Sequence, residues 1–140
     1  MATDEMPNNI PNPKPSGSLL LRLVPMPADV NPNGDIFGGW IMSQMDVAGG
    51  ILAGQRARSR AVTVSVETIN FIRPVHVGDI VCIYGEVVRV GRSSMSIYLE
   101  VYVSPALPPP PGADESLLVA SSAFTFVAID DNGRPHPVDR

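Results

Sequence analysis

The chain has 140 residues, enough for one domain with a real core and too few for two independent domains. Ten Lys and Arg residues against fourteen Asp and Glu residues give a formal net charge of −4, which excludes the broad basic face typical of nucleic-acid-binding proteins. The single cysteine, Cys82, excludes an intrachain disulfide, and with neither a signal-peptide pattern nor a long apolar stretch in the sequence we expect a cytoplasmic protein without a membrane partner.

The first half of the chain predicts one long helix. Residues 1–17 are rich in Pro and Asn, which predicts a flexible arm. Residues 18–24 predict a short strand, which Pro25 ends and a turn-rich loop follows. From Gly39 to about Arg58, apolar residues recur three and four positions apart, the period of a helix. Its other faces are also apolar, so we expect the sheet to wrap it.

The second half of the chain predicts strands, because it is rich in Val, Ile, Tyr and Thr. We expect them over residues 61–71, 79–90, 92–103 and 116–129. A proline-rich loop over residues 104–115 and a tail over residues 131–140 complete the chain. This pattern predicts an α+β fold in a single domain, residues 18–130, with one long central helix wrapped by a curved antiparallel sheet of about five strands.

The start of the predicted helix is the most informative stretch. Gly38 and Gly39 leave the first backbone N–H groups uncovered, and this positive end of the helix favours an oxyanion. Asp46 follows eight residues later among apolar and small neighbours, so we expect a buried carboxylate that reacts. It could act as a general base on water or attack a carbonyl itself to form a mixed anhydride, and both mechanisms stay open.

The length of the helix places this chemistry in two chains. An α-helix rises about 1.5 Å per residue, so eight residues separate the Gly38 amide from Asp46 by roughly 12 Å. One helix therefore cannot bring both groups to one carbonyl carbon. A two-fold pair of antiparallel helices can, with the N-terminus of one helix beside Asp46 of the other. We expect an active site shared across a dimer.

Several blocks of the sequence resemble the hotdog-fold acyl-CoA thioesterases, in particular the YciA-type branch related to the brain-type acyl-CoA hydrolases. The resembling blocks include residues 33–40, Ser43-Gln44-Met45-Asp46, Asn70-Phe71-Ile72-Arg73-Pro74, Val77-Gly78-Asp79 and Val90-Gly91-Arg92-Ser93-Ser94. The resemblance implies a hotdog fold and hydrolysis of acyl-CoA to CoA and a carboxylic acid, the EC 3.1.2 reaction class, with no metal and no bound cofactor. It also implies self-association as dimers, commonly assembled into a trimer of dimers, which is a hexamer.

Further site residues follow from this resemblance and from side-chain chemistry. In the brain-type relatives an amide that assists catalysis stands at the place of Asp35, so Asp35 either takes part in catalysis or caps the turn. Arginine and serine side chains donate hydrogen bonds to phosphates and short polar groups, which favours Arg73, Arg92, Ser93 and Ser94, beside the Gly91 turn, as CoA contacts. We expect further substrate contacts from Asn33, Phe37, Asn70 and Phe71.

Two other functions fit the sequence less well. A hotdog dehydratase needs a histidine and a carboxylate together at the start of the helix, and that segment contains no histidine. A non-catalytic acyl-CoA sensor would need a module that reads DNA, for which a 17-residue arm is too short. The two histidines, His76 and His136, share no segment with a second ligand, which argues against a metal site.

Overall fold

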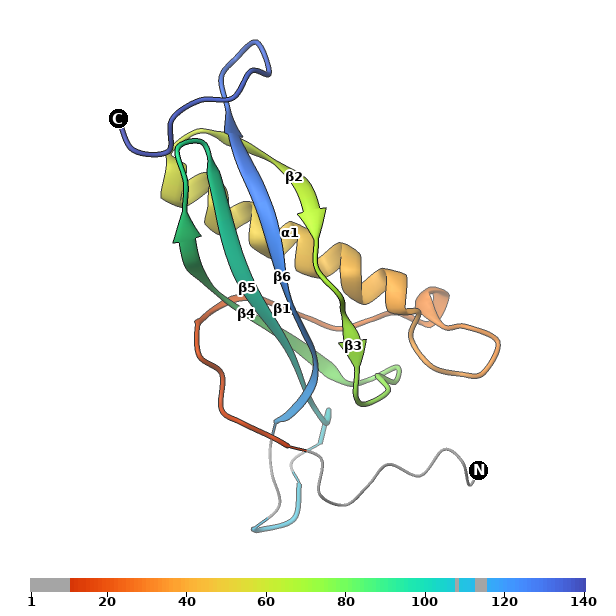
Figure 1. The fold of residues 1–140 in the computed structure, drawn as a ribbon. Helices are drawn as coiled ribbons and strands as arrows, with labels where there is room; N and C mark the ends of the chain where they lie inside the picture. The colour runs from red at the N-terminus through yellow and green to blue at the C-terminus, as the bar shows by residue number, and fades with distance from the viewer. Residues whose placement is uncertain (1–10, 108, 113–115) are drawn as a thin grey trace.

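The protein folds as one long helix against one sheet (Figure 1). The computed structural model describes residues 11–107, 109–112 and 116–140. The helix, α1, spans Gly38–Ala57, one residue earlier at each end than the spacing of apolar residues predicts. Every strand pairing in the sheet is antiparallel. The predicted α+β architecture is therefore confirmed.

The sheet has six strands in the order β1-β4-β5-β6-β2, with β3 also paired to β6. Their bounds are β1 Ser18–Leu23, β2 Arg60–Val66, β3 Asn70–Phe71, β4 Ile80–Val90, β5 Ser94–Ser104 and β6 Leu117–Ile129. The sequence predicts about five strands because it reads residues 61–71 as one. This segment divides because its register against β6 shifts. Val66 pairs with Phe124 and Asn70 with Ser121, so the four residues from Val66 to Asn70 advance only three residues along β6. The extra residue forms an irregularity that separates β2 from β3.

The core lies between α1 and the inner face of the sheet. Ile41, Met45 and Ala48 on the helix are buried in one cluster with Leu99 and Phe126 on the strands. This contact is close, because a Cβ atom at Gly49 would lie 2.7 Å from the Phe126 ring. Burial of this apolar face supplies most of the driving force that holds helix and sheet together.

The opposite side of α1 is open in the single chain. Met42, Val47 and Ile51 are 40%, 52% and 41% exposed. Strand β2, which packs beside α1, also has exposed valines, Val62, Val64 and Val66. The sheet therefore covers one side of the helix, as expected, and its path ends at β2 without covering the opposite side in the single chain. No helix in the described part of the chain is long and apolar enough to cross a membrane.

Residues 11–17 form a segment, here called the N-terminal strap, that packs against the sheet. The Asn12 side-chain oxygen accepts a hydrogen bond from Leu118 N at 2.8 Å. At the other end, a Cβ at Gly17 would lie only 2.3 Å from the Gly85 carbonyl oxygen, so only glycine permits this approach. The second half of the predicted arm thus packs on the domain, and residues 1–10 lie outside the described residues.

The strap covers a buried acid. Glu100 on β5 is 5% exposed, and its Oε1 atom accepts hydrogen bonds of 2.9 Å from both the backbone N–H and the hydroxyl of Ser16. Beside it, the Tyr102 hydroxyl donates to the Pro13 carbonyl at 2.6 Å. Burial, and then the neighbouring charge of Glu100, raise the pKa of Tyr102 to about 12. The strap therefore satisfies polar groups that the sheet alone would leave unpaired.

The C-terminal tail, residues 131–140, docks on the end of the molecule where α1 finishes. Val138 is buried, and its N–H donates to the Arg92 carbonyl at 2.8 Å. Asp139 pairs with Arg56 at 2.8 Å. The predicted proline-rich loop lies in part outside the described residues, and its described residues 105–107 and 109–112 form neither helix nor strand.

Candidate active site

The helix start is built by a turn that leaves its backbone donors open. Asn31 organises this turn, since its side-chain oxygen accepts from the N–H groups of Asn33 and Asp35 at 2.9 Å and 3.1 Å. No side chain caps α1, and the Phe37 carbonyl accepts only later N–H groups of the first turn. Within the described residues, the N–H groups of Gly38 and Gly39 thus have no acceptor. They provide a place for a negatively charged oxygen.

A cavity of about 1010 Å³ opens in front of this helix start. It is lined by Asn31, Asn33, Asp35, Ile36, Gly38, Ile41, Phe71, Arg73, Pro74, Val75 and His76. Five of the predicted site residues therefore meet here, although they come from two segments more than thirty residues apart. A Cβ at Gly38 would lie 3.3 Å from the Phe71 ring, so glycine lets the ring approach the helix start. Phe37, Gly39 and Asn70 are adjacent in sequence but do not line the cavity.

A histidine in this cavity is a feature that sequence reasoning missed. His76 Nε2 lies 3.3 Å from Asp35 Oδ1, and His76 Nδ1 lies 3.7 Å from Asp79 Oδ2. The helical segment itself contains no histidine, but the loop between β3 and β4 brings His76 to the helix start. No local spacing signals a contact across 41 residues.

Arg73 lines the large cavity and is also bonded to the sheet. Its guanidinium donates a short hydrogen bond to the Leu118 carbonyl on β6. This bond fixes the arginine to the sheet beside the cavity. Among the described residues, no group of three or more His, Cys, Asp or Glu side chains is placed to hold a metal ion.

Asp46 lies at a second, smaller cavity of about 250 Å³. Its lining is mainly apolar and consists of Met42, Ser43, Asp46, Thr63, Val66 and Phe124. Asp46 Oδ1 accepts a short hydrogen bond from the Thr63 hydroxyl. The expectation that Asp46 is buried is wrong for the single chain, where the residue is exposed, because this side of α1 has no cover.

The two cavities share no lining residue. Gly38 belongs to the first and Asp46 to the second, separated by roughly 12 Å along α1. Each chain therefore presents two separate cavities, one at the helix start and one at Asp46. The carboxylate of one chain cannot reach a carbonyl bound at the helix start of the same chain.

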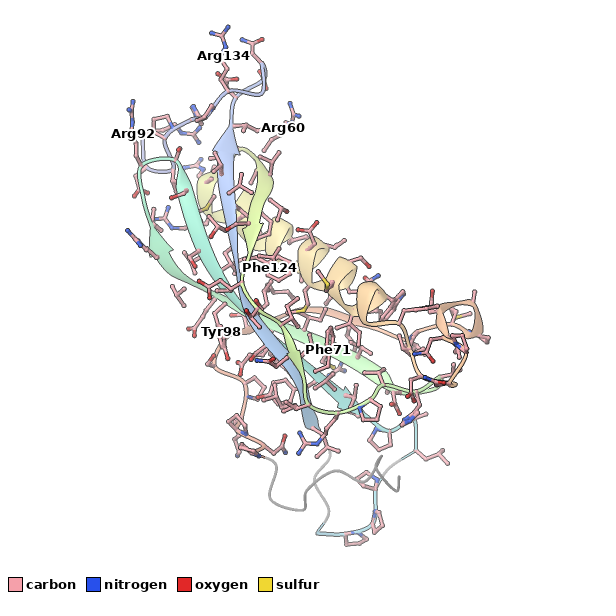
Figure 2. All side chains as sticks on the ribbon, turned by 45° about the vertical axis from the view of Figure 1, so that its right-hand side comes forward. Arg60, Phe71, Arg92, Tyr98, Phe124 and Arg134 are labelled. Atoms are coloured by element: carbon pink, nitrogen blue, oxygen red, sulfur yellow. The ribbon has the colours of Figure 1, made fainter. Side chains whose placement is uncertain are left out.

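The predicted CoA contacts at the β4–β5 hairpin lie at the other end of the molecule. Figure 2 shows Arg92 beside the end that also carries Arg60 and Arg134, far from Phe71. The hairpin is tight, with Gly91 N donating to the Ser94 carbonyl at 2.8 Å and the Ser93 carbonyl accepting from Ala128 N at 2.8 Å. The structure thus does not bring the hairpin and the large cavity together within one chain.

Comparisons with known proteins identify the family. The model of the thioesterase superfamily matches residues 33–106, more than half of the chain. An uncharacterized acyl-CoA thioester hydrolase of Haemophilus influenzae is 55% identical over 124 residues, which cover 89% of this chain and 79% of that protein. The acyl-CoA thioester hydrolase YciA of Salmonella typhimurium is 49% identical over 124 residues, or 89% of this chain and 92% of that protein.

A solved structure agrees with these relatives. It is that of a hexameric broad-specificity acyl-coenzyme A thioesterase in which one aspartate is replaced by alanine. Its TM-score to this chain is 0.83 at 53% sequence identity, and the match covers 89% of this chain and 88% of that one. The chain therefore belongs to the thioesterase superfamily, in the group that contains the YciA acyl-CoA thioester hydrolases.

Proposed function

We propose that this protein is an acyl-CoA thioesterase whose active site is shared between two copies of the chain. Its similarity to proteins named as acyl-CoA thioester hydrolases supports the reaction. The observation that carries the shared site is the separation of Gly38 and Asp46 into two cavities. A thioesterase needs an oxyanion site and a carboxylate at one carbonyl, and only a second chain can supply the missing half.

The exposed apolar face supports the pairing of two chains. Met42, Val47 and Ile51 on α1 are exposed, and Met42 lines the small cavity together with the exposed Val66 of β2. Exposed apolar side chains gathered on a small domain mark an interaction site. A two-fold axis across this face lays two α1 helices antiparallel. It sets the helix start of each chain beside Asp46 of its partner. The similar hexameric thioesterase supports a further step, the assembly of three such dimers into a hexamer. We place this assembly in the cytoplasm, the compartment that the sequence favours.

The reaction then divides between the chains. The N–H groups of Gly38 and Gly39 of one chain stabilise the carbonyl oxygen as it gains negative charge. Asp46 of the other chain takes a proton from water, whose oxygen attacks the carbonyl carbon, and CoA leaves as the thiolate. Alternatively the carboxylate attacks first, CoA leaves, and water hydrolyses the mixed anhydride. Neither route uses a metal or a cofactor, and Asp35 with Asn33 positions the water from the side of the large cavity.

CoA extends from the thioester toward the hairpin of the chain that supplies Asp46. From Asp46 to Ala57 at the end of α1, eleven residues span about 16 Å, a distance that the extended pantetheine arm bridges. Arg92, Ser93 and Ser94 at this end then bind its phosphates. Phe37, Asn70, Phe71 and Arg73, on or near the large cavity of the other chain, contact the acyl and pantetheine parts.

Release of free thiol from a panel of acyl-CoAs, from two carbons to sixteen, tests the reaction. Two inactive variants test the shared site. Asp46→Asn removes the carboxylate, and Gly38→Val covers the helix start. If equal amounts are unfolded and refolded together, about half of the dimers are mixed and each has one intact site, so about a quarter of wild-type turnover returns. If the refolded mixed dimers recover no activity, the shared site is contradicted.

The position of His76 supports one second candidate, a hotdog dehydratase. His76 and Asp35 lie 3.3 Å apart in the cavity at the helix start, where a dehydratase needs an acid and a base. Hydration of an enoyl-CoA removes its conjugated double bond without release of thiol. Loss of the enoyl-thioester absorbance with no free thiol would favour the dehydratase, whereas loss of this absorbance matched by an equal release of free thiol favours the thioesterase.

A further inference from the structure

The Asp46 carboxylate is tied to strand β2 by one side chain. The Thr63 hydroxyl donates a hydrogen bond to Asp46 Oδ1 across the gap between α1 and β2. Within the described residues, this hydroxyl is the one hydrogen-bond donor to the carboxylate. The second oxygen, Oδ2, thus keeps its lone pairs for a water molecule or a carbonyl carbon.

An irregularity in β2 sets this contact. Thr63 pairs with Phe126 and Ser65 with Thr125, so the register shifts between them and Val64 is the extra residue. In a regular strand, residues 63, 65 and 67 would share a face. The bulge instead turns Thr63 and Val66 to the same side, where both line the small cavity with Asp46. A bulge re-aims a side chain in this way at the edge of many sheets.

A carboxylate on an exposed helix face otherwise samples several rotamers. Asp46 is exposed in the single chain, and its helical neighbours Met42 and Gly50 offer no hydrogen bond to hold it. A hydroxyl bound to one oxygen selects a single rotamer and so fixes the direction of the other oxygen. Such pre-organisation contributes strongly to rate, because a displacement of about 1 Å can lower turnover by about a hundredfold.

We propose that Thr63 is the positioning residue for Asp46: its hydroxyl holds one carboxylate oxygen so that the other faces the thioester at the dimer interface. This inference rests on the proposed thioesterase function. Thr63 does not contact the reacting atoms in this proposal. Loss of its hydroxyl should therefore lower kcat and leave the binding of acyl-CoA unchanged.

The test compares Thr63→Val, which keeps the shape and removes the hydroxyl, with Thr63→Ser, which keeps the hydroxyl. We expect kcat to fall about ten- to a hundredfold in Thr63→Val with KM unchanged, and Thr63→Ser to stay near wild type. Ser65→Ala, on the same strand beyond the bulge, is the matched control and should keep full activity. Circular dichroism and gel filtration verify that each variant folds and assembles.

Two further measurements separate this inference from the function on which it rests. In an Asp46→Asn background, Thr63→Val should lower kcat no further, since both changes act through one carboxylate. A crystal structure of Thr63→Val should show Asp46 in a changed or a second rotamer. A folded Thr63→Val enzyme with wild-type kcat, or a Thr63→Ser enzyme as slow as Thr63→Val, overturns the positioning role alone. If wild-type protein releases no thiol, the proposed function fails, and the positioning role falls with it.

Discussion

Gly49 is the position on α1 where the addition of one methyl group should disturb the core. In Gly49→Ala the new Cβ would lie 2.7 Å from the Cε1 and Cζ atoms of Phe126 and 3.2 Å from Leu99 Cδ1. Phe126 is 1% exposed, so its ring cannot move into solvent. Overpacking of this kind costs about 1–3 kcal/mol, whereas alanine in place of glycine favours a helix by about 1 kcal/mol.

The neighbouring glycine provides the matched control. A Cβ at Gly50 would have no neighbour closer than 3.8 Å, so Gly50→Ala keeps the gain in helix propensity without the clash. The propensity terms cancel between the two variants, and Gly49→Ala should therefore be less stable than Gly50→Ala by about 1–3 kcal/mol. For a chain of this length that corresponds to roughly 3–9 °C in Tm.

Urea unfolding at one fixed protein concentration measures this difference, because self-association makes apparent stability depend on concentration. The slope of the unfolding curve should be the same in both variants, since neither changes the surface that unfolding exposes. If Gly49→Ala proves as stable as Gly50→Ala, the contact between α1 and Phe126 is looser than the structure shows, and the packing argument is refuted.

Three further predictions concern the strap, the tail and the hairpin. Glu100→Gln should lower the free energy of unfolding by about 1–3 kcal/mol, because the neutral amide makes weaker hydrogen bonds to the strap. In the same variant an ultraviolet titration should find the pKa of Tyr102 below about 12, because the charge of Glu100 is gone, but above its ordinary value, because burial remains. Arg56 lowers the pKa of Asp139, so their pairing stabilises the tail above the ordinary pKa of the acid and is lost as pH falls below about 4. The protection of the Val138 N–H against hydrogen exchange, taken relative to the unfolded chain at the same pH, should decrease with this loss, and Asp139→Asn should remove the decrease. Arg92→Ala should raise KM for acyl-CoA but not for acyl-pantetheine, which lacks the nucleotide phosphates; an equal rise for both substrates contradicts a phosphate contact.

Local patterns in the sequence predict the elements well and their contacts less well. The apolar period of three and four residues locates α1 within one residue at each end, because amphipathic spacing is a property of neighbouring residues. The strands β4, β5 and β6 also lie within two residues of their predicted ends. The division between β2 and β3 escapes prediction, since it depends on the register against β6.

The candidate site follows the same division. The glycines at the helix start and Asp46 stand out from the sequence through their chemistry. Thr63, which bonds to Asp46, and His76, which lies beside Asp35, do not stand out in the sequence. Each joins its cavity through a contact between segments far apart in the chain. The location of Arg92 at the opposite end of the molecule from Phe71 likewise needs the topology of the sheet and not the spacing of residues.

The strap has a consequence for the order in which a newly made chain can fold. Asn12 bonds to Leu118 and Ser16 to Glu100, so the first described residues find their partners only after β5 and the start of β6 exist. On the ribosome, α1 and the early strands can form before the strap has its partners. The strap can dock on the sheet only when synthesis is nearly complete. The strap is thus among the last parts of the described chain to reach its final place.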